Sequence, residues 1–217
     1  TYETVNIYPV LESLGHKVMI FPLINQVFSR EIRPLDRELL DIVKIMKPDL
    51  MIFLEYKNTI SVEVIRDITE HTSVTTLFIS GDDENFSAYV NNTFTTYKPA
   101  IEKHKEAGCP NVIFGGYYAN DKIYKKYKGK KNINISFVGA LTETRRLLFN
   151  KITMADIAIN IFGNGWPDSK ILTLSEYVLL INKSKVNLNV SIDNIGNKEF
   201  LQVKGRDFEV PMAGGFL

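Results

Sequence analysis

The chain has 217 residues, of which 45% are hydrophobic and 24% charged, an ordinary composition for a globular protein. Its 26 basic and 25 acidic side chains leave a net charge of +1, which gives no reason to expect nucleic acid or an anionic membrane as a partner. A single cysteine excludes an internal disulfide framework, and no apolar run approaches the roughly 20 residues that cross a bilayer. We expect a cytoplasmic protein with no integral membrane segment, built as one large domain or two small ones.

Helix and strand patterns alternate through the first half of the chain. Residues 5–14 carry apolar side chains at helical spacing, and Gly15 follows where a left-handed residue ends a helix. Strands are predicted at 17–23, 50–55 and 74–80, and the segments "NTFTTY" and "NVIFGG" continue the series; helices are predicted at 35–46, 61–70 and 98–107. This alternation predicts an α/β fold with parallel sheets and right-handed crossovers.

Residues 121–132, "DKIYKKYKGKKN", interrupt the alternation. Six of the twelve are lysines and nothing apolar recurs at a core period, which fits a solvated loop or a linker between domains. The alternation then restarts, with strands at 133–139, 157–163 and 185–190 and helices at 143–153 and 173–183. We therefore predict two domains, 1–130 and 131–217.

The chain begins and ends abruptly. No strand precedes the first helix, and residues 205–217, "GRDFEVPMAGGFL", resemble the first turns of a helix, a Gly-Gly hinge and the first two residues of a strand. A half-begun strand would leave backbone groups unpaired at a sheet edge. We expect this chain to be part of a longer protein, with its second domain incomplete.

Candidate ligand-binding residues follow the predicted strands of the second half. Open parallel sheets bind ligands at the carboxyl ends of their strands, where helix N-termini favour anions. Gly139 ends one strand, and Arg145 and Arg146 fall in the first turn of the next helix. Such arginines are most often solvated, yet the helix dipole disfavours cations there, so an anionic ligand would explain them better than stability does.

Further candidates lie at other strand ends. Gly163 and Gly165 form the next turn, with Trp166 able to line an apolar wall. Asp82 and Asp83 follow a buried strand of the first half, as a solvated turn or as carboxylates of a site, and Arg206 and Glu209 lie near the start of the last helix. We find no residues at metal-ligand spacing, no Walker loop and no nucleophile elbow, and we expect neither metal nor cofactor.

Several segments together resemble a known family. "INISFVGALTETRR", "INIFGNGWP", "INKSKVNLNVS" and "QVKGRDFEVPMAGGFL" occur in the order seen in the C-terminal domain of CgeB-like, GT-B-type glycosyltransferases. "LGHKV", the "DD" after a buried strand and "FTTYKPAIEKHKEAGCPNVIFGGYYAND" are similar to the N-terminal domain of those enzymes. The resemblance covers nearly the whole chain, and residues 203–217 are its most specific part.

This resemblance implies a GT-B-like architecture of two Rossmann-like domains, with an acceptor-side domain at 1–130 and part of a nucleotide-sugar donor domain at 131–217. It implies metal-independent transfer of a hexosyl group from a nucleotide sugar to a glycan, protein or small-molecule acceptor. By resemblance Glu209 binds the ribose, while Arg206 and either Arg145 or Arg146 face the diphosphate. Asp82 or Asp83 is the candidate base. Two alternatives remain open: an epimerase of nucleotide sugars on the same scaffold, and a non-catalytic carbohydrate- or protein-binding module.

Overall fold

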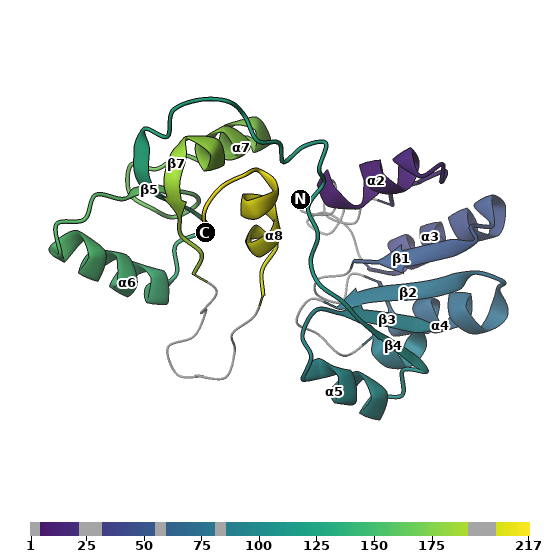
Figure 1. The fold of residues 1–217 in the computed structure, drawn as a ribbon. Helices are drawn as coiled ribbons and strands as arrows, with labels where there is room; N and C mark the ends of the chain where they lie inside the picture. Colours follow the sequence, from purple (N-terminus) through teal and green to yellow (C-terminus); the bar gives the residue numbers. More distant parts are fainter. Residues whose placement is uncertain (1–4, 22–31, 55–59, 81–85, 191–202) are drawn as a thin grey trace. The chain divides into compact units, whose positions relative to one another are not determined.

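The computed structural model describes residues 5–21, 32–54, 60–80, 86–190 and 203–217 (Figure 1). The chain divides into two compact units, which we treat separately. Unit 1 comprises Thr1–Val18 and Tyr117–Leu217, and unit 2 comprises Met19–Gly116. Of the residues that the sequence placed in the first domain, 5–18 and 117–130 thus group with the second half. Each unit contains one parallel sheet, which confirms the α/β class and is consistent with a GT-B-like pair of Rossmann-like domains.

Unit 2 is built on a four-stranded parallel sheet in the order β1-β2-β3-β4. Its strands are β1 (Leu50–Phe53), β2 (Thr75–Ser80), β3 (Asn92–Thr95) and β4 (Asn111–Phe114). The helices are α3 (Ile32–Met46), α4 (Val62–His71), the 3-10 turn η1 (Ser87–Tyr89) and α5 (Ala100–Glu106). Because the strand order follows the chain order, each connection carries the chain one step across the sheet.

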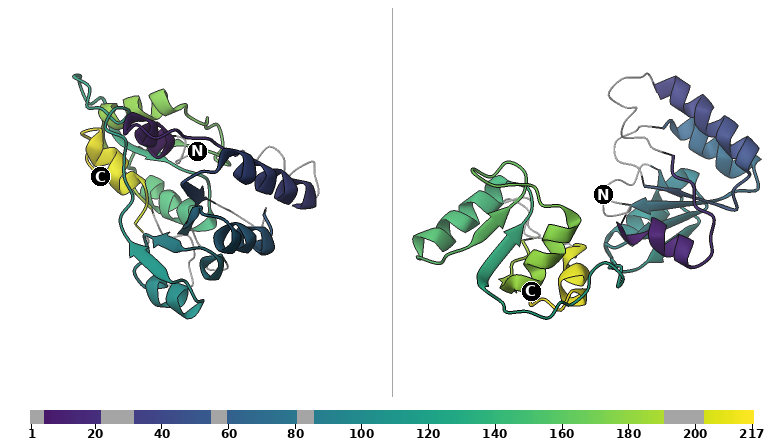
Figure 2. Two further views of the ribbon diagram at one scale, coloured as in Figure 1. Left: turned by 90° about the vertical axis from the view of Figure 1, so that its right-hand side faces the viewer. Right: turned by 90° about the horizontal axis from the view of Figure 1, so that it is seen from above.

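The core of unit 2 lies where α3 and α4 pack side by side against the sheet (Figure 2). Leu35, Leu39 and Val43 recur along α3 at helical spacing and are buried. They meet Ile65 of α4 and Phe78 of β2, both of which are fully buried.

The predicted strand at 17–23 is wrong over the residues that the structure describes. Residues 17–21 adopt no strand conformation, and residues 22–23 lie outside the described part of the chain. Met19 and Ile20 are about half exposed, at 52% and 51%. Apolar composition predicted the strand, but a strand also needs a hydrogen-bonded neighbour, which composition does not supply.

Unit 1 is built on a three-stranded parallel sheet in the order β6-β5-β7. Its strands are β5 (Ile133–Val138), β6 (Asn160–Phe162) and β7 (Ser184–Asn187), and its helices are α2 (Tyr8–Ser13), α6 (Glu143–Met154), α7 (Leu174–Lys183) and α8 (Arg206–Met212). After α8, Phe216 O accepts a hydrogen bond from Asn187 N of β7 at 2.8 Å. The last residues therefore begin to pair with the sheet, as their sequence suggested.

A capping box starts α7. Thr173 Oγ1 accepts a hydrogen bond from Glu176 N at 3.3 Å, and Glu176 Oε2 accepts one from Thr173 N at 2.9 Å. A hydrogen bond from Lys170, followed by those from Thr173, lowers the pKa of Glu176 to about 2. The capping box therefore fixes the first turn of α7, and the Tyr177 side chain of this helix is directed towards α8.

Two apolar clusters form the core of unit 1. One joins Phe137, Phe149 and Val190. The other joins Tyr124, Val178, Ile181, Val210 and Ala213. Tyr124 belongs to the predicted solvated loop or linker, yet it is only 3% exposed. The expectation of a wholly solvated segment is therefore wrong at Tyr124, because one aromatic ring can enter a core without any apolar periodicity around it. No helix in the described ranges is long and apolar enough to cross a membrane.

Replacing Phe78 by alanine should destabilise unit 2. Phe78 is fully buried, so Phe78→Ala removes core contacts and leaves a cavity, with an expected loss of about 3–5 kcal/mol in the free energy of unfolding. Phe114→Ala is the matched control, because Phe114 is 52% exposed in the same sheet. Urea denaturation of the whole chain, followed by circular dichroism, measures both; equal losses in the two variants would contradict the described core.

Candidate functional site

Three hydrogen bonds join the loop after β5 to the end of β6 and the loop that follows it. Gly139 N donates to Phe162 O at 2.8 Å, and Leu141 N donates to Asn164 O at 2.8 Å. Trp166 Nε1 donates to Gly139 O at 2.8 Å. These bonds fix the carboxyl ends of two neighbouring strands, where the sequence predicted ligand-binding turns.

The three predicted glycines are required by close packing at these strand ends. Gly163 has a φ of +133°, and a Cβ atom there would overlap the carbonyl group of Gly139. Gly165 has a φ of +85°, and its Cβ would lie 3.1 Å from the Leu141 side chain. A Cβ on Gly139 would come within 2.8 Å of the Phe137 ring. A Cβ atom would thus meet backbone at Gly163 and side chains at Gly139 and Gly165, so close packing favours glycine at all three positions.

Trp166 closes the apolar side of these loops. Its ring centroid lies 5.4 Å from that of Phe149 and 6.3 Å from that of Phe137, and the side chain is half-buried. With its indole N–H bonded to Gly139 O, Trp166 fixes the loop after β6 onto the core. Sequence reasoning placed it correctly in this turn but did not foresee its part in the core.

Arg145 and Arg206 both lie over the Phe137 ring, near the end of β5. The guanidinium carbons lie 5.5 Å and 5.2 Å from the centroid of the Phe137 ring. Arg145 donates to Ala140 O at 2.9 Å and to Val190 O at 3.1 Å, and Arg206 Nη2 donates to Val138 O. Two positive charges from different helices thus converge on one strand end.

Arg146 points elsewhere. It forms a two-pronged ion pair with Glu143 on the exposed surface of α6, with distances of 2.5 Å and 2.8 Å. The hydrogen bonds of this pair raise the pKa of Arg146 and lower the pKa of Glu143. The sequence left open which arginine faces the strand end, and in the structure Arg145 lies there.

Asp207, which sequence reasoning missed, organises the start of α8. Its carboxylate accepts hydrogen bonds from Lys204 N and from Asn189 Nδ2, both at 2.7 Å. Asn189 Oδ1 in turn lies 3.5 Å from Arg206 Nη1. Arg206 Nε is buried and has no hydrogen-bond partner among the described residues. A buried donor in this position favours a further acceptor close to the arginine.

Glu209 is bound from two sides. Its Oε1 accepts a hydrogen bond from the Tyr124 hydroxyl and its Oε2 accepts one from the Tyr177 hydroxyl, each at 3.0 Å. Burial, and then the charge of Glu209, raises the pKa of both tyrosines well above the usual range, so both hydroxyls keep their protons. No sequence pattern marked either tyrosine, because the two lie 53 residues apart, at positions 124 and 177.

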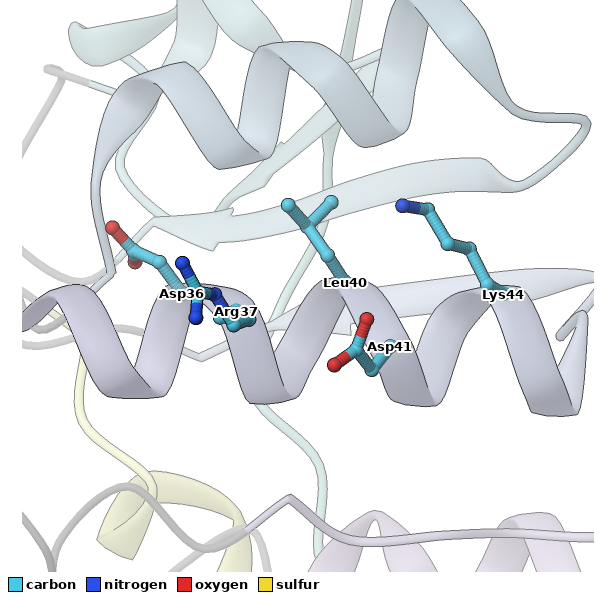
Figure 3. Close-up of a pocket in the computed structure, with 5 residues that line it drawn as sticks. All are labelled: Asp36, Arg37, Leu40, Asp41 and Lys44. Carbon is cyan, nitrogen blue, oxygen red and sulfur yellow. The ribbon is translucent and has the colours of Figure 1, made fainter.

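Asp82 and Asp83, the remaining predicted site residues, fall outside the described residues. A hollow in unit 2 runs along α3 and is lined from that single helix by Asp36, Arg37, Leu40, Asp41 and Lys44 (Figure 3). Asp36 Oδ1 accepts a hydrogen bond from Ser61 N at 3.0 Å, so its carboxylate is used to hold the start of α4. Within the described ranges, no group of three or more His, Cys, Asp or Glu residues is placed to hold a metal ion.

The comparisons with known proteins concern this part of unit 1. Residues 144–217 match the family model described as "Glycosyl transferase-like". That match supports glycosyl transfer in general. No curated protein and no solved structure matches the chain. The glycosyl transferase-like segment includes Arg145, Arg206 and Glu209 together with the turn at Gly163, so the family match and the convergent polar cluster fall on the same elements.

The glycine turn gives a stability prediction. Gly163→Ala should cost about 1–3 kcal/mol, because alanine is strained at a φ of +133° and its Cβ meets the backbone of Gly139. Gly129→Ala is the control, since a Cβ there meets nothing within 4 Å. Thermal unfolding monitored through the fluorescence of Trp166 measures both variants. Equal melting temperatures would show that the two loops do not approach as described.

Proposed function

We propose that the chain is a CgeB-like glycosyltransferase that moves a hexosyl group from a nucleotide sugar to an acceptor hydroxyl. The observation that carries the proposal is the position of Arg145 and Arg206, which both lie over the Phe137 ring at the carboxyl end of a parallel strand. Both arginines belong to the segment that matches a glycosyl transferase-like family. Ligands of open α/β sheets bind at such strand ends.

The chemistry of the leaving group explains why two guanidinium groups would be useful. When the bond between the anomeric carbon and the diphosphate oxygen breaks, negative charge grows on the diphosphate. Preorganised positive charge at that point is usually the largest single contribution to catalysis. Guanidinium groups also match phosphate geometry through paired N–H donors. In the proposal, Arg145 and Arg206 bind the diphosphate, and Gly139, Gly163 and Gly165 let it approach the backbone while Trp166 lines the loop.

Glu209 is the proposed ribose ligand. Each oxygen of a carboxylate can accept more than one hydrogen bond, and each oxygen of Glu209 accepts one from a tyrosine. The carboxylate therefore retains acceptor capacity for two neighbouring ribose hydroxyls, and the side chain is only partly buried. This geometry supports the role that the resemblance implies.

The acceptor is proposed to be a glycan, a protein or a small molecule with a free hydroxyl. Its oxygen forms the new bond to the anomeric carbon, and its proton passes to a base as the nucleoside diphosphate leaves. Asp82 or Asp83 remains our candidate for that base.

Arg145 and Arg146 provide a matched test, since they are neighbours with different surroundings. Arg145→Gln should weaken binding of a nucleoside diphosphate by about tenfold or more, because a hydrogen bond to a charged group contributes roughly 1.5–3 kcal/mol. Arg146→Gln should change the affinity less than twofold, since Arg146 pairs with Glu143 on the surface. Calorimetric titration of the whole chain with uridine, guanosine, cytidine and adenosine diphosphates measures both. Equal losses, or none, would remove Arg145 from the site.

Turnover should survive removal of divalent cations, because the proposed site meets the diphosphate charge with arginines. The measurement is release of nucleoside diphosphate from a labelled nucleotide sugar before and after treatment with EDTA. Activity that disappears and returns with Mn²⁺ or Mg²⁺ would contradict the proposal. The same labelled sugar, recovered as an isomer without any acceptor, would instead indicate an epimerase.

A further inference from the structure

Two tyrosines from distant parts of the sequence converge on one carboxylate. Tyr124 precedes β5 and is 3% exposed, whereas Tyr177 lies in α7. Their rings meet edge to face, with centroids 6.4 Å apart, and each hydroxyl is 3.0 Å from a different oxygen of Glu209. Both hydroxyls donate to the same group, so the plane of the carboxylate is fixed from two directions.

Apolar side chains pack around this arrangement. Tyr124 packs in the same buried cluster as Val178 and Val210, which lie next to Tyr177 and Glu209 in their helices. The positive charge of Arg206 also acts on the Tyr177 hydroxyl. Tyr177 therefore connects the carboxylate of Glu209 to the guanidinium proposed to face the diphosphate.

We propose that Tyr124 and Tyr177 are positioning residues that orient the carboxylate of Glu209 towards the ribose hydroxyls of a nucleoside diphosphate. This inference rests on the proposed function, and it assigns the tyrosines a role in affinity rather than in stability alone. A glutamate side chain has several rotatable bonds, and fixing it before the ligand arrives lowers the cost of binding. Tyrosine hydroxyls suit this task, because they donate without adding a charge that would compete with the ligand.

Conversion to phenylalanine isolates the hydroxyls, because the rings and their packing are kept. In the whole chain, Tyr124→Phe and Tyr177→Phe should each weaken binding of uridine diphosphate threefold to tenfold. Binding of 2′,3′-dideoxyuridine diphosphate, which lacks both ribose hydroxyls, should change less than twofold. Tyr127→Phe is the control, since Tyr127 lies in the same segment and is 51% exposed. If the parent chain binds the diphosphate of another nucleoside more tightly than uridine diphosphate, that diphosphate and its 2′,3′-dideoxy analogue are used instead.

A double-mutant cycle with Glu209→Gln completes the test. If the tyrosines act through Glu209, adding Tyr177→Phe to Glu209→Gln should cost little further affinity. Weakening of the dideoxy ligand to the same extent as the normal ligand would overturn the inference, because the tyrosines would then act through packing. Unchanged affinity of the tyrosine variants for both ligands would also overturn the inference.

Different results would overturn the proposed function and the role of the tyrosines. A parent chain that binds none of the four nucleoside diphosphates overturns the proposed function, and the role of the tyrosines falls with it. A parent chain that binds one of them, with tyrosine variants that bind it equally well, overturns the inference alone. Thermal melting of each variant shows whether it is folded. Tyr177→Phe serves if Tyr124→Phe does not fold, because the Tyr177 side chain is more exposed to solvent.

Discussion

The carboxylate of Glu209 connects three parts of unit 1 that are far apart in sequence. Helix α8 carries Glu209 itself, and the segment before β5 and helix α7 each contribute one tyrosine that donates to its carboxylate. A partly buried carboxylate must be satisfied by hydrogen bonds, and a buried phenol left without an acceptor costs about 1–3 kcal/mol. The three elements therefore hold one another in place: moving any of them breaks a bond that water replaces poorly. The packing of Val178 and Val210 around this contact is apolar and nondirectional. The hydrogen bonds to Glu209 therefore fix how the three elements are oriented relative to one another.

The end of β5 shows how neutral acceptors can hold a cation without cancelling its charge. Arg145 and Arg206 donate to carbonyl oxygens and lie over an aromatic ring, whereas Arg146 donates to a carboxylate. An exposed ion pair such as that of Arg146 contributes little to stability and weakens in salt. A guanidinium that is held by carbonyl oxygens next to a buried ring keeps its positive charge uncancelled, and this charge would attract an incoming anion. Two neighbouring arginines of one helix thus have different electrostatic roles.

Sequence patterns predicted those features that depend on local rules. The alternation of elements predicted two parallel sheets, and the glycines at 139, 163 and 165 were placed correctly at strand ends. The patterns did not predict that Tyr124 would be buried, because its neighbours are lysines and a single core residue has no period. Nor did they predict that Glu209 would face two tyrosines, since that contact depends on tertiary packing between positions with no common spacing. Arg145 could be separated from Arg146 only once the direction of α6 relative to β5 was known.

Residues 1–18 and 117–217 form one unit, with all of unit 2 between them in the sequence, and this order affects how the chain folds. Asn6 Oδ1 accepts a hydrogen bond from Asn120 N across a separation of 114 residues. Closing so long a loop costs entropy and slows folding, although the cost rises only logarithmically with length. During synthesis, unit 2 can form as soon as its last strand emerges, while the first residues must wait for a partner more than one hundred residues downstream. The packing of residues 5–18 therefore depends on a segment that the whole of unit 2 separates from them in the sequence.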